Sequence, residues 1–225
     1  MTEINFKRIT LFMGHYGSGK TNIAINYAHR IRRSGHEVAI ADLDIVNPYF
    51  RMKDSQEEML REGIDVIALP FANSSVDLPA LPSEAYSLVQ NRSRYAVLDI
   101  GGDDRGALAL GRFTPYILEE NNFDVFFVAN FYRPLTQTPE DALEVMREIE
   151  GASGLPFTGI INNSNLGAET AAETVLKSVG KCEKLSELSG LPIVFTSVND
   201  KLGEELEGKI PMLMKLSLQH RIFDR

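Results

Sequence analysis

The sequence predicts an α/β protein built on a mostly parallel, twisted sheet of about seven strands, with helices on both faces. Short apolar runs alternate with helical patterns along the 225 residues of the chain. Most of these runs are apolar throughout, as expected for parallel strands that are buried on both faces and joined by right-handed crossovers. The expected strands cover residues 9–14, 37–43, 64–70, 95–100, 124–130, 157–162 and 191–197.

The first expected helix follows Lys20. Ile23, Tyr27 and Ile31 recur there at helical spacing and form one apolar stripe. The pair Ser34-Gly35 is expected to end this helix, since glycine accepts the left-handed conformation that follows many helix ends.

A second clear helix is expected after residue 138. Thr138 is suited to cap it, Pro139 suits its first position, and Gly151 is the expected stop. Two more helices are expected over residues 168–180 and 181–190, and a C-terminal helix over about 204–222 that docks on the sheet. The Pro/Ser-rich stretch 70–83 reads as a surface loop, so residues 1–225 are expected to form a single domain.

Composition narrows the class of protein. Apolar residues make up 44% of the chain and charged residues 24%, which is ordinary for a globular protein with a substantial core. The formal net charge of −8 argues against nonspecific nucleic-acid binding, which needs a basic surface. Cys182 is the only cysteine, which excludes an internal disulfide and a cysteine metal cluster. With no apolar run long enough to span a bilayer, we expect a cytoplasmic protein.

The stretch "GHYGSGKT", residues 14–21, fits the phosphate-loop pattern G-x-x-x-x-G-K-[ST] in full, between an apolar run and a helical pattern. Its glycines let backbone N–H groups face phosphate oxygens, and the helix N-terminus attracts negative charge. Lys20 would reach the β- and γ-phosphates, and the Thr21 hydroxyl would help to hold Mg²⁺. The expected nucleotide contacts are Gly14, His15, Tyr16, Gly17, Ser18, Gly19, Lys20, Thr21 and Asn22.

Acidic residues follow two of the expected strands, where ligands sit in open parallel sheets. Asp99 ends the run "YAVLD" and would hold Mg²⁺ directly or through a water, and Gly102 lies where the backbone can approach the γ-phosphate. Asp42 and Asp44 are spaced to face the same side of an extended segment. Asp44 is the better candidate for a metal ligand or for positioning the attacking water, so Lys20 and Asp44 are the expected catalytic residues.

The order of these motifs resembles the ParA/MinD/nitrogenase-iron-protein class of P-loop ATPases, also called the CobQ/CobB/MinD/ParA nucleotide-binding domain family. The resemblance spans about residues 6–200 in motif order. It implies the three-layer P-loop NTPase fold, with Asp44 in switch I and Asp99 to Gly102 in the Walker B and switch II segment. It also implies a Mg-ATP-driven switch that hydrolyses ATP and forms a nucleotide-dependent homodimer.

The segment after the strand at 157–162 bears on the choice of base. P-loop GTPases read guanine with N-K-x-D, whose aspartate accepts two hydrogen bonds from the base. This chain has Asn163-Ser164-Asn165-Leu166 at that place, without the lysine and the aspartate. ATP is therefore preferred, with Asn163 as the adenine contact and Asn162 as the second choice, although both could simply form a turn after the strand.

The phosphate loop departs from the family pattern at one position. The ParA/MinD subgroup carries a lysine after the first loop glycine, and it neutralises charge on the partner's nucleotide. His15 stands there and would not reliably bring a positive charge at neutral pH. Slow hydrolysis, a different dimer, or a substitute cation such as Arg51 or Arg105 could follow. Tyr16 could stack on a partner or on the nucleotide, or shield the loop.

The sequence leaves the partner unidentified. A Tyr49-Phe50 pair after the expected switch I residue would suit docking of an effector protein if it is exposed. A membrane-binding C-terminal helix is possible in this family, but the apolar stripe more simply indicates docking on the core. The alternative function is an ATP-dependent small-molecule ligase or kinase of the cobyrinic-acid or dethiobiotin synthase type, with the 70–83 loop lining its substrate pocket.

Overall fold

The computed structural model describes residues 5–43, 53–67, 83–101 and 110–217 of the chain. All strands belong to one sheet in the order β3-β2-β4-β1-β5-β6-β7-β8, and every neighbouring pair is parallel. The strands are β1 Ile9–Met13, β2 Val38–Leu43, β3 Asp65–Ile67, β4 Tyr95–Ile100, β5 Phe123–Ala129, β6 Gly159–Asn162, β7 Ile193–Asn199 and β8 Leu213–Leu216.

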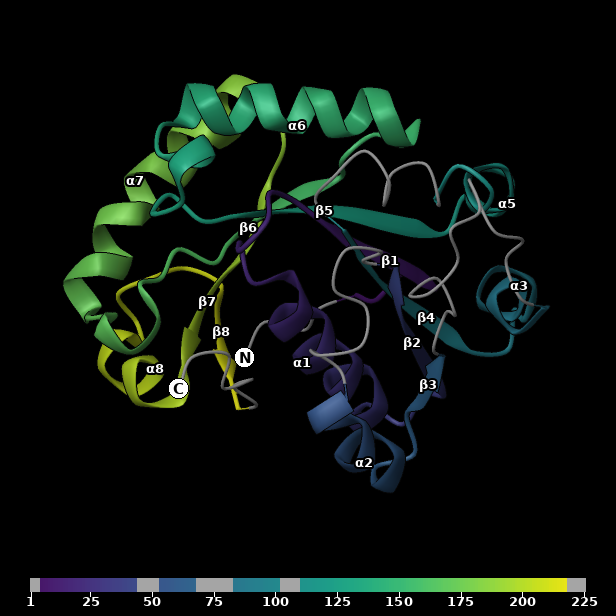
Figure 1. Cartoon of the computed structure of the whole chain (residues 1–225). Coiled ribbons are helices and arrows are strands. Elements are labelled where there is room, and N and C mark those ends of the chain that lie inside the picture. Colours follow the sequence, from purple (N-terminus) through teal and green to yellow (C-terminus); the bar gives the residue numbers. More distant parts are fainter. Residues whose placement is uncertain (1–4, 44–52, 68–82, 102–109, 218–225) are drawn as a thin grey trace.

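Helices cover both faces of this sheet (Figure 1). They are α1 Lys20–Arg33, α2 Lys53–Arg61, α3 Ser83–Gln90, α5 Thr114–Glu120, α6 Pro139–Ser153, α7 Ala172–Ser189 and α8 Asp200–Leu206. One buried apolar cluster joins the sheet to α3, α5, α6 and α7, and a second joins it to α1 and α2. The three-layer architecture predicted from the strand–helix alternation is confirmed.

The position of β1 sets the place of the site. β1 lies between β4 and β5, so the chain winds away from it in both directions. Ligands of open parallel sheets bind beyond the carboxyl ends of the strands, at the point where the winding reverses. That point is the end of β1 at Met13, directly before the phosphate-loop motif.

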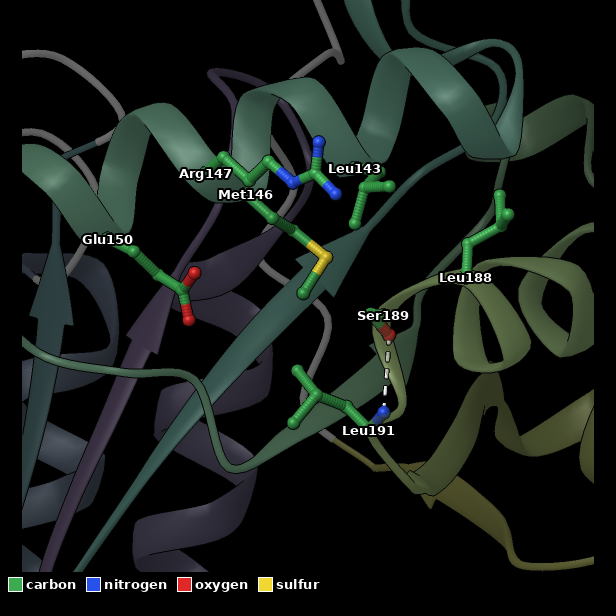
Figure 2. Close-up of a pocket in the computed structure, with 7 residues that line it drawn as sticks. All are labelled: Leu143, Met146, Arg147, Glu150, Leu188, Ser189 and Leu191. Carbon is green, nitrogen blue, oxygen red and sulfur yellow. Dashed lines mark hydrogen bonds between the residues drawn. The ribbon is translucent and has the colours of Figure 1, made fainter.

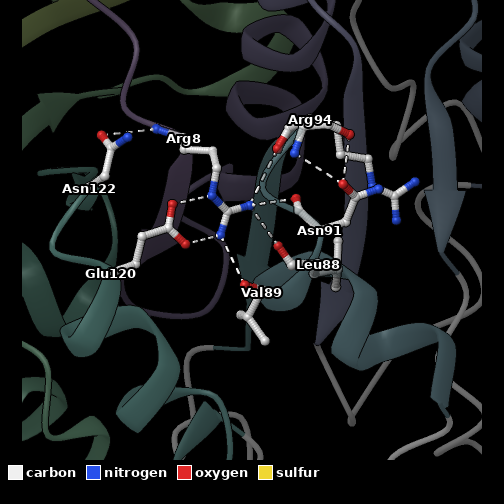
Figure 3. A network of polar contacts seen from close by, with 8 residues as sticks. Arg8, Leu88, Val89, Asn91, Arg94, Glu120 and Asn122 are labelled. Atoms are coloured by element: carbon white, nitrogen blue, oxygen red, sulfur yellow. Dashed lines mark hydrogen bonds and ion pairs between the residues drawn. The ribbon is translucent and has the colours of Figure 1, made fainter.

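Arg8 fixes the far end of β1 to two helices (Figure 3). Its side chain is 7% exposed and forms a two-point ion pair with Glu120, at the end of α5. It also donates to the backbone carbonyls of Leu88, 3.1 Å away, and Val89, 3.2 Å away, near the end of α3. One buried cation therefore satisfies carbonyls that a helix end leaves without partners, and it joins α3 and α5 to the sheet.

The predicted helix boundaries hold in part. α1 ends before Ser34 and Gly35, the latter with φ 89°, as expected. Thr138 caps α6 through its hydroxyl, which accepts a hydrogen bond from the N–H of Asp141 at 3.1 Å. The expected stop at Gly151 is wrong: α6 continues to Ser153 and is capped by Gly154, whose φ of 68° requires the left-handed region.

The two helices predicted over 168–180 and 181–190 are one helix, α7. Its buried residues continue at helical spacing through the predicted break at Gly180. They are Val175, Ser178, Cys182 and Leu185. A glycine inside a helix costs only about 1 kcal/mol relative to alanine, so the packed stripe outweighs it.

The C-terminal helix predicted over 204–222 is also wrong within the described residues. α8 ends at Leu206, and β8 adds an eighth strand beside β7. Pro211 interrupts any helix there, and in β8 burial alternates, with Met214 and Leu216 facing the core. β8 thereby covers the edge of β7, whose backbone donors and acceptors would otherwise lie open.

Candidate nucleotide-binding site

The phosphate loop connects β1 to α1 and depends on its glycines. Gly14, Gly17 and Gly19 have φ of 151°, 76° and 89°, in the region that favours glycine. A Cβ on Gly14 would stand 2.6 Å from the backbone oxygen of Val128, and one on Gly19 would collide with the amide of Asn163. The loop is therefore packed closely against the ends of β5 and β6, and larger residues at these two positions would displace it.

Lys20 lies along this loop. Its side chain is 5% exposed, and its Nζ donates to the carbonyl oxygens of Gly14 at 2.9 Å and His15 at 3.2 Å. The amide of Ser18 donates to the His15 oxygen at 3.1 Å and closes a turn within the loop. The Ser18 hydroxyl is buried and has no hydrogen-bond partner among the described residues. A buried cation and an unused buried hydroxyl thus face the concave backbone that the motif predicts for phosphate.

Two of the three residues predicted to hold a metal ion, Thr21 and Asp99, lie together. The Oγ1 of Thr21, at the start of α1, donates to Oδ2 of Asp99 at 2.6 Å, and both side chains are buried. Asp99 is the fifth residue of β4 and stands beside Phe12 of β1 and Asp42 of β2 in the sheet register. Parallel pairing therefore brings the hydroxyl and the carboxylates to one edge of the sheet.

A magnesium ion would find only part of its ligands in the protein. No group of three or more His, Cys, Asp or Glu side chains is gathered for a metal anywhere in the described ranges. Mg²⁺ keeps several waters and is usually held by one or two protein oxygens together with substrate phosphates. Thr21 and Asp99 fit that pattern, whereas Asp44 and Gly102 lie outside the described residues.

Asn163 was predicted to contact the base, but both ends of its side-chain amide form hydrogen bonds within the protein. Its Nδ2 donates to the Ser18 carbonyl at 2.6 Å, and its Oδ1 accepts from the Ser197 hydroxyl at 2.6 Å. Asn162, the second choice, is fully buried and donates to the Ser178 hydroxyl at 2.9 Å. Within the protein, Asn163 thus ties the phosphate loop to the ends of β6 and β7.

His15 and Tyr16 form the outer rim of the loop. The His15 Nδ1 lies 3.0 Å from the carbonyl oxygen of Tyr16, and the Tyr16 side chain is 57% exposed. Arg51 and Arg105, the predicted substitute cations, lie outside the described residues, as do Tyr49 and Phe50.

One cation at this loop was not predicted from the sequence. Arg133, four residues beyond β5, donates from Nε to the carbonyl oxygen of Gly17 at 2.9 Å. The contact spans 116 residues, and local patterns cannot show it. The sheet order does indicate this segment: β5 neighbours β1, so the loop after β5 must emerge beside the loop that follows β1.

Two other features lie apart from the loop. A pocket of about 140 Å³ opens between α6 and α7, at the edge of the sheet where β6 and β7 begin (Figure 2). It is lined by Leu143, Met146, Arg147, Glu150, Leu188, Ser189 and Leu191.

Burial raises the pKa of the Cys182 thiol to about 12, so this side chain is not a nucleophile at neutral pH. Within the described part of the chain, no helix is long and apolar enough to cross a membrane.

Comparison with known proteins supports the fold. No family model matches the chain. The signal recognition particle protein of Mycobacterium leprae is 26% identical over 206 residues, which is 87% of this chain and 36% of that protein. The chain thus spans about a third of the length of this curated relative.

The solved structures point to the same architecture. The cell division protein FtsY of Thermotoga maritima superposes with a TM-score of 0.57 at 18% identity, over 90% of this chain and 64% of that one. Chloroplast FtsY of Physcomitrella patens gives 0.57 at 20%, over 90% and 62%. The signal recognition particle receptor FtsY of Elizabethkingia anophelis, in complex with GDP, gives 0.53 at 16%, over 90% and 60%.

These matches and the loop geometry show that the chain has the P-loop NTPase fold. They do not single out the ParA/MinD class within it, nor adenine as the base. The fold predicted from the sequence is therefore confirmed, whereas the narrower resemblance to the ParA/MinD class is not.

Proposed function

We propose that the chain binds a Mg²⁺–nucleoside triphosphate in the loop 14–21 and acts as a nucleotide-dependent switch that regulates a partner protein. Hydrolysis would be slow or stimulated by that partner. The observation that carries the proposal is the assembled loop, in which Lys20 lies along the backbone and the Thr21 hydroxyl is 2.6 Å from Asp99. The nearness of a cation, a hydroxyl and a carboxylate at one loop supports this proposal, because phosphate and Mg²⁺ are bound by such groups.

We favour ATP as the nucleotide. Guanine recognition of the N-K-x-D type needs a carboxylate that accepts two hydrogen bonds. Leu166, 46% exposed, stands at that position and cannot accept any. Asn163, at the first position of the pattern, holds Ser18 and Ser197. GTP is the competing candidate, because one of the similar FtsY structures is a GDP complex.

The partner is expected at the edge of the sheet that carries the loop. Three side chains there expose large apolar surface: Tyr16 at 57%, Leu135 at 58% and Leu166 at 46%. They follow β1, β5 and β6, so all emerge at the carboxyl ends of neighbouring strands. A protein docked on this edge would be in a position to sense the nucleotide. A second copy of this chain, as in the predicted ATP-dependent homodimer, is one such partner, and an unrelated effector protein is the other.

The alternative, a small-molecule ligase or kinase, needs a substrate pocket at the phosphates. The pocket between α6 and α7 lies at the opposite edge of the sheet and gives it no support. The 70–83 loop that was expected to line a substrate pocket falls mainly in residues 68–82, outside the described ranges.

The test is isothermal titration calorimetry with Mg-ATP, Mg-ADP, Mg-GTP and Mg-GDP. We expect wild-type protein to bind adenine nucleotides more tightly than guanine nucleotides, and Lys20→Ala to lose binding of both. Lys184→Ala, which removes an exposed lysine on α7, is the matched control and should bind as the wild type does. If the wild-type protein binds none of the four nucleotides, the proposed function is wrong; if guanine nucleotides bind more tightly, only the choice of base is wrong.

A further inference from the structure

Arg133 places a second cation on the phosphate loop. Its Nε is 2.9 Å from the Gly17 carbonyl oxygen. Its Cδ and Cζ atoms lie 3.7 and 3.8 Å from the point where a Cβ on Gly17 would stand. The guanidinium group therefore lies beside the loop backbone, in van der Waals range of Gly17.

The segment that carries Arg133 is held firmly by buried Asn130. The Asn130 carbonyl accepts from the Arg133 amide at 3.1 Å and from the Thr136 hydroxyl at 2.7 Å. Its side-chain oxygen accepts from the Tyr132 amide at 3.0 Å. The neighbouring Phe131 amide donates to the Ser164 hydroxyl at 3.0 Å. The segment is thus fixed to the residues that follow β6, and its arginine is held on the loop rather than free in solvent.

The terminal nitrogens of Arg133 carry N–H donors that take no part in these contacts. A guanidinium group has five N–H donors, and only the one on Nε has a hydrogen-bond acceptor among the described residues. The side chain is half-buried, so water screens its charge less than on an open surface. A nucleoside triphosphate in the loop would bring several negative charges to this place, with Lys20 as the other cation in contact with the loop.

We propose that Arg133 is a further nucleotide-contacting residue, whose guanidinium group supplies positive charge in cis to the phosphates bound by the loop. It would provide, within one molecule, a cation that His15 does not reliably provide at the signature position. The inference rests on the proposed function, since it assumes that the loop binds a nucleotide. In a purely structural role, by contrast, Arg133 would act only through the hydrogen bond from its Nε to the Gly17 carbonyl.

The experiment compares Arg133→Gln and Arg133→Lys with wild type, using Mg-ATP and inorganic tripolyphosphate as ligands in calorimetry. Charge-assisted hydrogen bonds are stronger than neutral ones. Arg133→Gln should therefore lower the affinity for both ligands about tenfold or more. Arg133→Lys should keep most of the affinity, because it keeps the charge. The salt dependence of binding should be shallower in Arg133→Gln than in wild type.

Arg147→Gln is the matched control, because it removes an exposed arginine of α6 at the distant pocket. It should leave both affinities and the salt dependence unchanged. Tripolyphosphate binding that is unaffected by Arg133→Gln would overturn the proposal and would indicate a contact with the base or ribose instead. An equal loss in Arg133→Gln and Arg133→Lys, with unchanged salt dependence, would overturn it in favour of a structural role. Failure of the wild type to bind Mg-ATP would count against the proposed function, whatever the variants do.

Discussion

Thr21 and Asp99 show how one side-chain contact joins two motifs of the site. They lie 78 positions apart in the chain, yet the Thr21 hydroxyl donates to the Asp99 carboxylate at 2.6 Å in a buried setting. If Mg²⁺ binds with the nucleotide, these two side chains are the ones that would help to hold it, since hydroxyl and carboxylate oxygens suit this ion. The contact therefore marks the place where metal dependence should reside.

We predict that Thr21→Val lowers the affinity for Mg-ATP, because the isosteric side chain cannot bind the metal. The loss should be about tenfold or more and should shrink when calorimetry is repeated with EDTA in place of Mg²⁺. Thr21→Ser keeps the hydroxyl and should bind nearly as the wild type does. Equal losses with and without Mg²⁺ would contradict a metal role for Thr21.

Asn163 and Arg133 show the limit of residue-level reasoning from sequence. The sequence identified Asn163 by its place after a strand, but not that its amide holds both Ser18 and Ser197. No local pattern singles out Arg133, whose contact with Gly17 spans 116 residues. Both contacts join loops from neighbouring strands, and their geometry depends on the strand order rather than on any local pattern.

At the scale of elements, α2 is held on α1 by a polar contact at its end. His29, buried on α1, lies with its Nδ1 2.6 Å from the carboxylate of Glu62, which directly follows α2. The His29 hydrogen bond and the nearby positive charges lower the pKa of Glu62. The folded protein thus favours the ionised form of Glu62 more than the unfolded chain does.

This contact predicts a pH-dependent contribution to stability. Because the folded-state pKa of Glu62 is lowered, the contribution is present above the unfolded-state pKa and is lost as the pH falls through the folded-state value. Urea unfolding of Glu62→Gln should show a loss of about 1 kcal/mol near neutral pH, which disappears in acid. Glu57→Gln, in an exposed pair with Arg61, is the control and should change little at either pH. A loss for Glu62→Gln that persists in acid would exclude the carboxylate as its cause.

α7 and β8 show why element boundaries could not be predicted fully. Gly180 and Pro211 are both residues that commonly end helices, yet only Pro211 accompanies a change of structure. The difference lies in packing, since α7 buries a continuous stripe against the sheet while β8 extends the sheet at its β7 edge. Local propensity is worth about 1 kcal/mol or less per residue for glycine, and tertiary contacts override it.

At the scale of the whole molecule, Arg8 joins the parts that carry the site to the rest of the fold. It ties the start of β1 to the ends of α3 and α5 (Figure 3). β1 ends at the phosphate loop, so this network anchors the strand from which the loop emerges. The network lies at the edge of the sheet opposite the loop, so we expect it to serve stability rather than binding.

We predict that Arg8→Met destabilises the protein by about 3–5 kcal/mol, because it leaves the carboxylate of Glu120 buried without its cation. Chemical denaturation would measure the loss. The double variant Arg8→Met with Glu120→Gln should recover part of it, since the unpaired charge is then absent. Mg-ATP affinity of the folded Arg8→Met protein should stay near the wild-type value, and a strong loss would show that the network also shapes the loop.

The sequence by itself determined the fold class and the phosphate-loop motif, and it pointed to Thr21 and Asp99 as candidates for one metal site. These follow from local chemistry: apolar runs form buried parallel strands, and only certain residue types suit a tight phosphate-binding turn. The tertiary structure alone decided that Asn163 and Arg133 hold the loop from the segments after β6 and β5, and that Leu213–Leu216 joins the sheet as β8. Those contacts depend on which strands become neighbours, and the strand order is a property of the packed sheet as a whole.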